Sequence, residues 1–487
     1  MTPQIVKLTD YRPPGLPGWL LGIAFVALAI TPIGVAATTG LAPTAPIQEL
    51  ATAFGLTGGA LLFLQFLSSG RYPTLSGRIG IDRTMGFHRI AAIVLLALVI
   101  LHPLGYVLSA ALMDSSLAWP RLVGMLTSKR LLSGVAAVAC LIALVGLAFM
   151  RTQKRFRYEI WRASHGIFAM AAAALTLHHV LSVGAYSRET PVMVVWIVFA
   201  GTAMIAIAIV YVVRPMRLLR RPWQVHKIDQ IASDTLLLEL RTPEPSSFKF
   251  KAGQFAWLTM PMTRSPICDH PFSIASAPEE LPLLRFVIRD VGDFTHHLRR
   301  LPPGTLVTVD GPHGGFVLDH FGTDVVMVAG GVGIAPVLGI LEEAARNGDP
   351  RRFRLLYAER KAPAFACHDR LRRLQDHLNL ELNLYVDIAA VPANMHQGPI
   401  EPEHIAGAID DPHTTIAYVC GPPLMMSAMT DALLDQGVPQ HAVRFESFDF
   451  ATTAGKLNRR RRFKALATLA LVVSFALAFG VRSLLLA

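Results

Sequence analysis

Six apolar runs, each close to 20 residues long, constrain the fold of this chain more than any other feature. They lie near 19–39, 49–68, 88–111, 131–150, 161–183 and 191–213. A helix needs about 20 predominantly apolar residues to cross the hydrocarbon core of a bilayer. The sequence therefore predicts a helical transmembrane domain of six helices over residues 1–213.

Basic residues cluster beside alternate ends of these runs. They are Lys7, Arg12, Arg71, Arg78, Arg83, Arg89, Arg151, Lys154, Arg155, Arg157, Arg214, Arg217, Arg220 and Arg221. Cytoplasmic loops carry an excess of Lys and Arg, so the N-terminus and everything after residue 214 are expected on the cytoplasmic side. The net charge of +11 is thus explained by membrane orientation, and no nucleic-acid partner is expected.

The composition turns soluble after residue 222, where two patterns follow one another. Short strands at 224–231, 235–241, 255–260, 284–290 and 305–310, separated by turns, predict an antiparallel β-barrel over 222–321. From 322 to 450 strands alternate with helical segments, which predicts a doubly wound α/β domain. Its expected strands are 325–329, 353–358, 381–386 and 415–419, with a helix at 335–346.

The last segment, 451–487, predicts a basic linker and one further transmembrane helix. Residues 459–462 are four arginines and 465–485 are apolar, so the C-terminus is expected outside. The cysteines Cys140, Cys268, Cys367 and Cys420 are scattered without a CxxC motif, which argues against an iron–sulfur cluster or a disulfide framework.

Histidines inside the apolar runs are the first sign of function, because ionisable side chains at membrane depth are costly. His88 and His102 are fourteen residues apart and His165 and His178 thirteen, so each pair spans about 20 Å of helix. Two such helices can meet at two levels, the geometry for two bis-histidine haems. His179 competes with His178, because fourteen residues keep it within about 40° of the face of His165. Histidines that only pack the bundle are the alternative.

The predicted barrel carries a pattern suited to a flavin. His270, Pro271, Phe272 and Ser273 offer a flat aromatic ring and a hydroxyl for the polar edge of an isoalloxazine. Gly253-Gln254-Phe255 precedes this segment and the stretch 289–295 follows it. In that stretch Gly292 lets the backbone approach a pyrophosphate, Thr295 can donate to it and Arg289 adds charge. Ordinary turns of a β domain are the alternative.

The α/β half carries a glycine-rich turn directly after an apolar strand. Gly330, Gly331 and Gly333 allow close backbone approach, and Pro336 suits the first turn of a helix whose N-terminus attracts phosphate. Cys420-Gly421 ends another strand of the same sheet, where ligands bind in open α/β folds. Cys420 could equally be a buried structural cysteine.

In combination these motifs resemble the ferric reductase and NADPH oxidase superfamily, in a bacterial form with a ferredoxin-reductase-type dehydrogenase. The resemblance covers residues 15–450 and rests on both histidine pairs, HPFSIAS, RDVGDFT, DGPHG, GGVGIAP and CGPPLM. It implies two haem b groups, one held by His88 with His165 and an outer one by His102 with His178. It also implies FAD at 270–273 and 289–295, and the nicotinamide cofactor at 330–336 with Cys420 and Gly421 near its ring.

The expected catalytic side chains are Phe272, Ser273 and Cys420. Arg360 falls where the family places a contact to the 2′-phosphate, which favours NADPH over NADH; a solvated loop charge is the alternative. Phe448 and Phe450 resemble the family's terminal aromatic cover of the flavin, although this chain continues beyond them.

The implied activity is electron transfer from cytosolic NAD(P)H through FAD and two haems to ferric iron or oxygen outside a bacterial inner membrane. A periplasmic protein or a quinone is the alternative acceptor. A haem-free, membrane-anchored flavin reductase is the competing interpretation.

Overall fold

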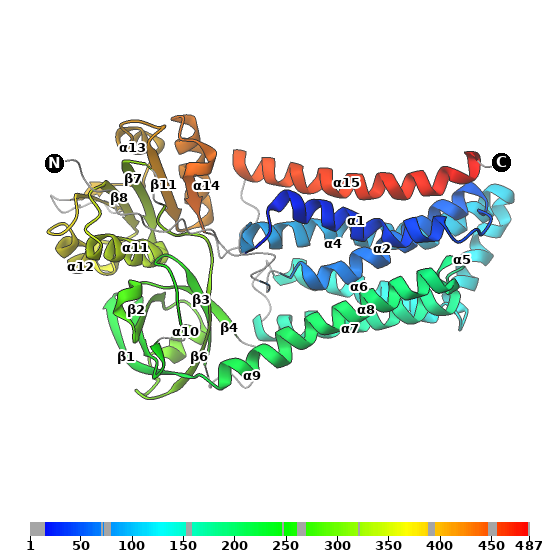
Figure 1. The fold of residues 1–487 in the computed structure, drawn as a ribbon, viewed down its shortest axis with the longest axis horizontal. Coiled ribbons are helices and arrows are strands. Elements are labelled where there is room, and N and C mark those ends of the chain that lie inside the picture. The colour runs from blue at the N-terminus through cyan, green and yellow to red at the C-terminus, as the bar shows by residue number, and fades with distance from the viewer. Residues whose placement is uncertain are drawn as a thin grey trace. The chain divides into compact units, whose positions relative to one another are not determined.

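The computed structural model describes residues 15–69, 72, 79–151, 158–245, 248–260, 269–319, 322–387, 395–446 and 455–485 (Figure 1). The chain forms two compact units. A helical unit contains Gly15–Pro215 and Arg461–Ala487, and a second unit is built from Met216–Arg460. The two units are described in turn.

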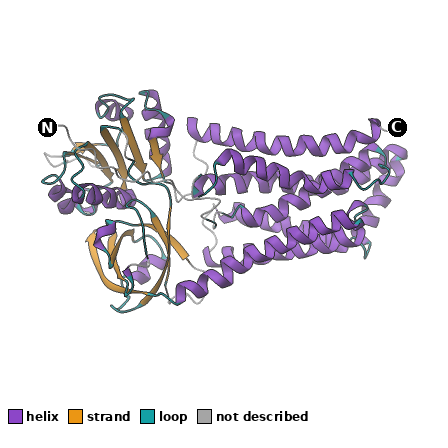
Figure 2. Ribbon diagram, viewed as in Figure 1, coloured by secondary structure: helices purple, strands orange, loops and turns teal. Residues whose placement is uncertain are grey.

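Within the described residues, seven helices of the helical unit are long and apolar enough to cross a membrane (Figure 2). They are α1 (Gly18–Ala37), α2 (Pro46–Leu67), α4 (Ile81–Met113), α6 (Leu132–Arg151), α7 (Tyr158–Val183), α8 (Thr190–Ala208) with its continuation to Leu219, and α15 (Lys456–Leu485). The segment 112–129 between two of these helices contains a short helix, α5 (Ala118–Thr127). The expected membrane-type helical domain is confirmed.

Helix α2 is the most buried of these spans, and small residues let its neighbours approach. A Cβ added at Gly58 would lie 2.8 Å from the side chain of Val99 on α4. One added at Gly59 would lie 2.9 Å from the ring of Trp196 on α8. Helices in membranes associate through such small-residue contacts, so α2 is the centre around which α4 and α8 pack.

The first half of the second unit is an antiparallel sheet of six strands. They are β1 (Trp223–Ala232), β2 (Thr235–Arg241), β3 (Phe255–Thr259), β4 (Asp269–Ser273), β5 (Leu283–Arg289) and β6 (Leu306–His313), in the order β4-β3-β6-β1-β2-β5. A bridge between Ile274 and Phe286 joins the two edge strands. The enclosed core includes Leu238, Leu258 and Phe286, which are fully buried. The expected antiparallel FAD-type sheet is confirmed.

The second half is a parallel sheet in the order β10-β9-β8-β7-β11-β12. Its strands are β7 (Asp324–Gly330), β8 (Arg352–Glu359), β9 (Leu380–Val386), β10 (His396–Gln397), β11 (Thr415–Cys420) and β12 (Val443–Phe445), with helices α11 (Ile334–Arg346), α12 (His368–Leu374), α13 (Pro402–Gly407) and α14 (Pro423–Asp435). Strand β7 is central: β8, β9 and β10 follow on one side of it, and β11 and β12 lie on the other side. The switch point of the strand order, where ligands bind in such folds, is therefore at the carboxyl ends of β7 and β11.

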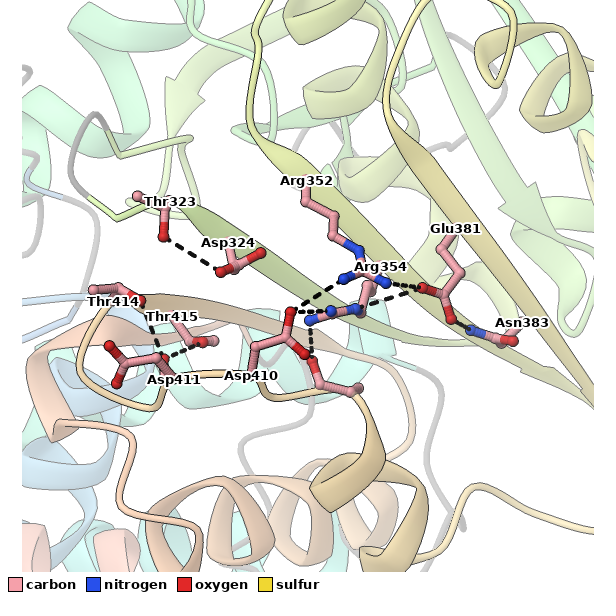
Figure 3. A network of polar contacts seen from close by, with 11 residues as sticks. Thr323, Asp324, Arg352, Arg354, Glu381, Asn383, Asp410, Asp411, Thr414 and Thr415 are labelled. Carbon is pink, nitrogen blue, oxygen red and sulfur yellow. Dashed lines mark hydrogen bonds and ion pairs between the residues drawn. The ribbon is translucent and has the colours of Figure 1, made fainter.

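A polar network ties the strands together at the opposite, amino-terminal edge of this sheet (Figure 3). Arg354, almost fully buried, donates to the Ala408 carbonyl at 2.9 Å and pairs with Asp410. Arg352 reaches the same Asp410 at 3.1 Å and Glu381 on β9 at 3.0 Å. These contacts join β8, β9 and the segment before β11. The glycine-rich turn lies at the opposite, carboxyl edge of the sheet.

Candidate functional site

His102 on α4 faces His179 on α7. Their ring centroids are 6.5 Å apart and the ring planes are nearly perpendicular, at 85°. His102 Nδ1 lies 2.7 Å from the carbonyl oxygen of Ala51 on α2, so its Nε2 is the atom left to face His179. A histidine that binds a metal almost always gives its other ring nitrogen such a partner.

Two glycines make room for these rings. A Cβ at Gly55 on α2 would lie 2.6 Å from His102 Nδ1, and one at Gly134 on α6 would lie 2.6 Å from His179 Nδ1. Both distances are far inside van der Waals contact, so any larger residue would displace the imidazole. Four helices thus contribute to this pair, two with histidines and two with glycines.

His178 differs from its expected position. Consecutive residues on a helix point about 100° apart. In the structure His178 is exposed on the outside of the helical unit, and its neighbour His179 turns inward toward His102. The structure therefore brings together His102 and His179, as the fourteen-residue spacing indicated, and not His102 and His178.

The second pair, His88 and His165, lies further along the same two helices. His165 is close enough to His88 to interact with it electrostatically, and it packs against Trp161 with ring centroids 5.3 Å apart. His88 Nδ1 lies 3.1 Å from Ser68 Oγ, and Gln65 donates to the His88 carbonyl at 3.1 Å. The end of α2 thus orients His88, much as its beginning orients His102.

The spacing of His102 and His179 would suit two histidine ligands of one haem iron. Two metal–nitrogen bonds of about 2 Å plus two imidazole radii give a centroid separation of about 6 Å. The observed 6.5 Å between His102 and His179 agrees with it. In the described part of the chain no three His, Cys, Asp or Glu side chains gather as a metal site. A two-histidine set suits a metal whose remaining ligands come from a macrocycle.

The flavin motif forms the edge strand β4 and the turn after it. Ser273 pairs with Phe255 and is buried, whereas His270, Pro271 and Phe272 are half-buried. Phe294 on the short helix α10 (Asp293–Leu298) lies 3.9 Å from the ring of His270, and its ring is nearly parallel to that of Phe272. The motif therefore presents a continuous aromatic surface beside a hydroxyl, which fits an isoalloxazine and its dinucleotide.

Thr295 and Arg289, predicted to contact a pyrophosphate, also make contacts within the protein. The Thr295 hydroxyl accepts from the backbone N–H groups of Val291 and Gly292 and donates to the Gly292 carbonyl, so it shapes the turn. Arg289 pairs with Asp234 at 2.9 Å and with Glu359, at the end of β8, at 3.2 Å. Arg289 thus links the antiparallel sheet to the parallel sheet beside the glycine-rich turn.

The glycine-rich turn lies at the switch point of the parallel sheet. Gly331 has a φ of +59°, and a Cβ there would lie 3.1 Å from the Arg289 guanidinium. A Cβ at Gly333 would lie 2.2 Å from the Cys420 carbonyl, and one at Gly330 would lie 2.8 Å from Pro422. Only glycines allow this turn to pack against the end of β11, where Cys420 and Gly421 stand.

Burial controls the chemistry of this edge. It raises the pKa of the Cys420 thiol well above its usual range, so the thiol stays protonated. Burial also raises the pKa of Glu359, although Arg289 opposes the shift. Arg360, the next residue, is exposed at the end of β8, as a phosphate contact or a solvated charge would be. Phe448 and Phe450 lie outside the described residues.

Comparison with known families assigns each part of this arrangement. The family described as "Ferric reductase like transmembrane component" matches residues 54–176. "Oxidoreductase FAD-binding domain" matches residues 222–318, and "Oxidoreductase NAD-binding domain" matches residues 327–431. The chain thus combines a ferric reductase-like transmembrane component with FAD-binding and NAD-binding oxidoreductase domains. It is an NAD(P)H oxidoreductase.

Curated relatives of this ferric reductase-like protein match its second unit. It is 28% identical over 235 residues to the propane 2-monooxygenase reductase component of Mycolicibacterium goodii, covering 46% of this chain and 66% of that one. It is 29% identical over 237 residues to the 2-halobenzoate 1,2-dioxygenase electron transfer component of Burkholderia cepacia, covering 48% and 68%. The chain thus spans about two thirds of the length of these relatives.

Solved structures also match part of the chain. One is a ferredoxin NADP+ reductase from Neisseria gonorrhoeae, at 23% identity and a TM-score of 0.42, covering 46% of this chain and 97% of that one.

Several residues of the candidate site belong to no sequence motif. The histidines are oriented or accommodated by ordinary small residues, which are Ala51, Gly55 and Gly134 within apolar helices and Ser68 directly after α2. Phe294 does fall inside the recognised stretch 289–295, so its aromatic ring was a signal that the motif already contained.

Proposed function

We propose that this protein carries electrons from NAD(P)H through FAD and two haem b groups across the membrane to ferric iron or oxygen on the outer side. The observation that carries the proposal is the facing pair His102 and His179, with a spacing suited to an iron and a carbonyl partner on the second nitrogen of His102. His88 and His165, one bilayer level away on the same helices, are proposed as the ligands of the inner haem.

Backbone and side-chain groups of the helical unit orient the histidine rings and leave space for them. Ala51 fixes the ring of His102, Ser68 fixes that of His88, and Gly55 and Gly134 keep the space beside the outer rings free. We propose His179, rather than His178, as the outer partner, because His178 is exposed.

Residues of the second unit are proposed to hold two cofactors, FAD and NAD(P)H. FAD, when bound, accepts an electron pair from the nicotinamide and passes electrons on singly. Phe272 would cover the flavin ring and Ser273 would hydrogen-bond its polar edge, while the 330–333 turn would receive the pyrophosphate of NAD(P)H. Cys420, held protonated by burial, would lie beside the nicotinamide without competing as a nucleophile.

The charge pattern supports the orientation. The basic residues after Arg214 and in the 459–462 run favour a cytoplasmic dehydrogenase and an outward C-terminus in a bacterial inner membrane. A periplasmic protein or a quinone is the second candidate acceptor.

The test uses the detergent-solubilised full chain under anaerobic conditions. We expect a Soret band that shifts on adding NADPH, two haems per FAD, and reoxidation by oxygen or a chelated ferric salt. His102→Ala is expected to abolish reduction of the external acceptor while NADPH still reduces FAD. A flavin-only spectrum would overturn the proposal in favour of a haem-free flavin reductase.

A further inference from the structure

Helix α15 is tied to the helical unit by an ion pair near each end. Arg461 lies 2.8 Å from Asp82, in the first turn of α4, and Arg482 lies 2.9 Å from Glu49, in the first turn of α2. The two arginines are 21 positions apart, about 31 Å along the helix, which matches a hydrocarbon core of about 30 Å. The helix is therefore fixed at both ends of its span.

The pair at the end of α15 is part of a saturated buried cluster. Glu49 is fully buried, and its Oε1 accepts from the Tyr186 hydroxyl at 2.7 Å and from Arg482 Nε at 3.1 Å. Its Oε2 accepts from the backbone and hydroxyl of Thr44, at 3.2 and 3.0 Å. Arg482 also lies over the ring of Phe479, 3.8 Å from its centroid. Because both carboxylate oxygens are engaged, the cluster is suited to fixing the backbone rather than to binding a ligand.

The backbone that this cluster fixes is the one that orients His102. Glu49 precedes by two residues Ala51, whose carbonyl contacts His102 Nδ1. Between them, a Cβ added at Gly480 on α15 would lie 2.7 Å from Leu50 Cα, so the two helices touch at this point. Tyr186, the third member, follows α7, the helix that carries His179. The cluster thus connects the supports of both facing histidines.

We infer that α15 is a positioning element of the outer histidine pair and that Arg482 is its positioning residue. Arg482 holds Glu49, Glu49 holds the first turn of α2, and that turn presents the Ala51 carbonyl to His102. Partners of this kind in the second shell of a metal site set the orientation of the ligand and contribute to its affinity. The inference rests on the proposed function, because it concerns the ligands of the outer haem.

The experiment compares full-length variants by haem content per FAD and by the low-spin EPR signals of the oxidised protein. Arg482→Met removes the charge and keeps most of the length. Arg482→Lys restores the charge, and Arg462→Met removes an exposed arginine of the same helix as a control. Gly480→Leu separates α15 from α2 without altering any charge.

We expect haem content to fall from two to about one per FAD in Arg482→Met and in Gly480→Leu, with loss of one EPR signal. Arg482→Lys and Arg462→Met should keep both haems. Two haems with unchanged EPR signals in Arg482→Met would overturn the inference; if that variant does not accumulate in the membrane, the same result for Gly480→Leu overturns it. A wild-type protein without haem would refute the proposed function itself and be distinguishable from either result.

Discussion

Gly134→Ala tests the outer histidine pair through a change of one methyl group. The added Cβ would lie 2.6 Å from both Nδ1 and Cε1 of His179. Ordinary contact begins at about 3.4 Å, so the ring or the helix must move by about 0.8 Å, more than the ~0.5 Å that a preorganised site tolerates. A free imidazole could rotate away, but one that is bound to iron cannot.

The expected result is loss of the outer haem, from two haems to about one per FAD, with the inner haem and flavin retained. Alanine is favoured over glycine in a helix by about 1 kcal/mol, so weaker helix formation cannot explain such a loss. Gly146→Ala on the same helix is the matched control, because a Cβ there meets nothing within 4 Å.

The assay is a pyridine haemochrome measurement beside flavin fluorescence on the purified protein, followed by the rate of ferric chelate reduction with NADPH. External reduction should fall at least tenfold in Gly134→Ala and stay near wild type in Gly146→Ala. If Gly134→Ala keeps two haems and full external reduction, His179 does not hold an iron at the position that the structure gives it.

Three further outcomes follow from the structure. His179→Ala should reduce haem content to about one per FAD, whereas His178→Ala should leave it at two; the opposite result would restore His178 as the ligand. Arg360→Ala should raise the KM for NADPH about tenfold and leave that for NADH unchanged, and equal effects on both would make Arg360 a solvated charge. Burial raises the pKa of the Cys367 thiol from 9.0 to about 11, so the folded state favours the protonated thiol. The contribution of this thiol to folding stability is complete below pH 9 and is lost as the pH rises toward 11. The melting temperature should therefore fall less steeply between pH 8 and 11 in Cys367→Ala than in wild type. Identical slopes would contradict the raised pKa of Cys367.

The architecture was predictable because its signals are periodic and long. Apolar runs of membrane length predict helices whatever their neighbours are. The change from short strands to strand–helix repeats marks the boundary between the antiparallel sheet and the parallel sheet. The turns after β7 and β11 were found because glycine is required there by geometry, as the 2.2 Å approach of a Gly333 Cβ to the Cys420 carbonyl demonstrates. What escaped prediction was α5, a short amphipathic helix between two long ones.

The contacts of the candidate site were harder to predict from the sequence, because they depend on which helices become neighbours. No local pattern connects Arg482 with Glu49, or Gly134 with His179, since these pairs are brought together only by packing. Arg289 shows the same limit within the second unit. Its position in a flavin motif predicted a phosphate contact, and the fold pairs it with Asp234 and Glu359.

Helical geometry explains why His179 rather than His178 meets its partner. His88 and His102 are fourteen residues apart, and at about 100° per residue the second ring lies about 40° short of the face of the first. His165 and His179 have the same spacing, so the direction of the histidine side chain turns by the same angle around both helices between the two levels. Two packed helices can then oppose their histidines at both levels with one crossing geometry. A thirteen-residue spacing would turn the second ring about 140° away from the first, toward the exposed side where His178 lies.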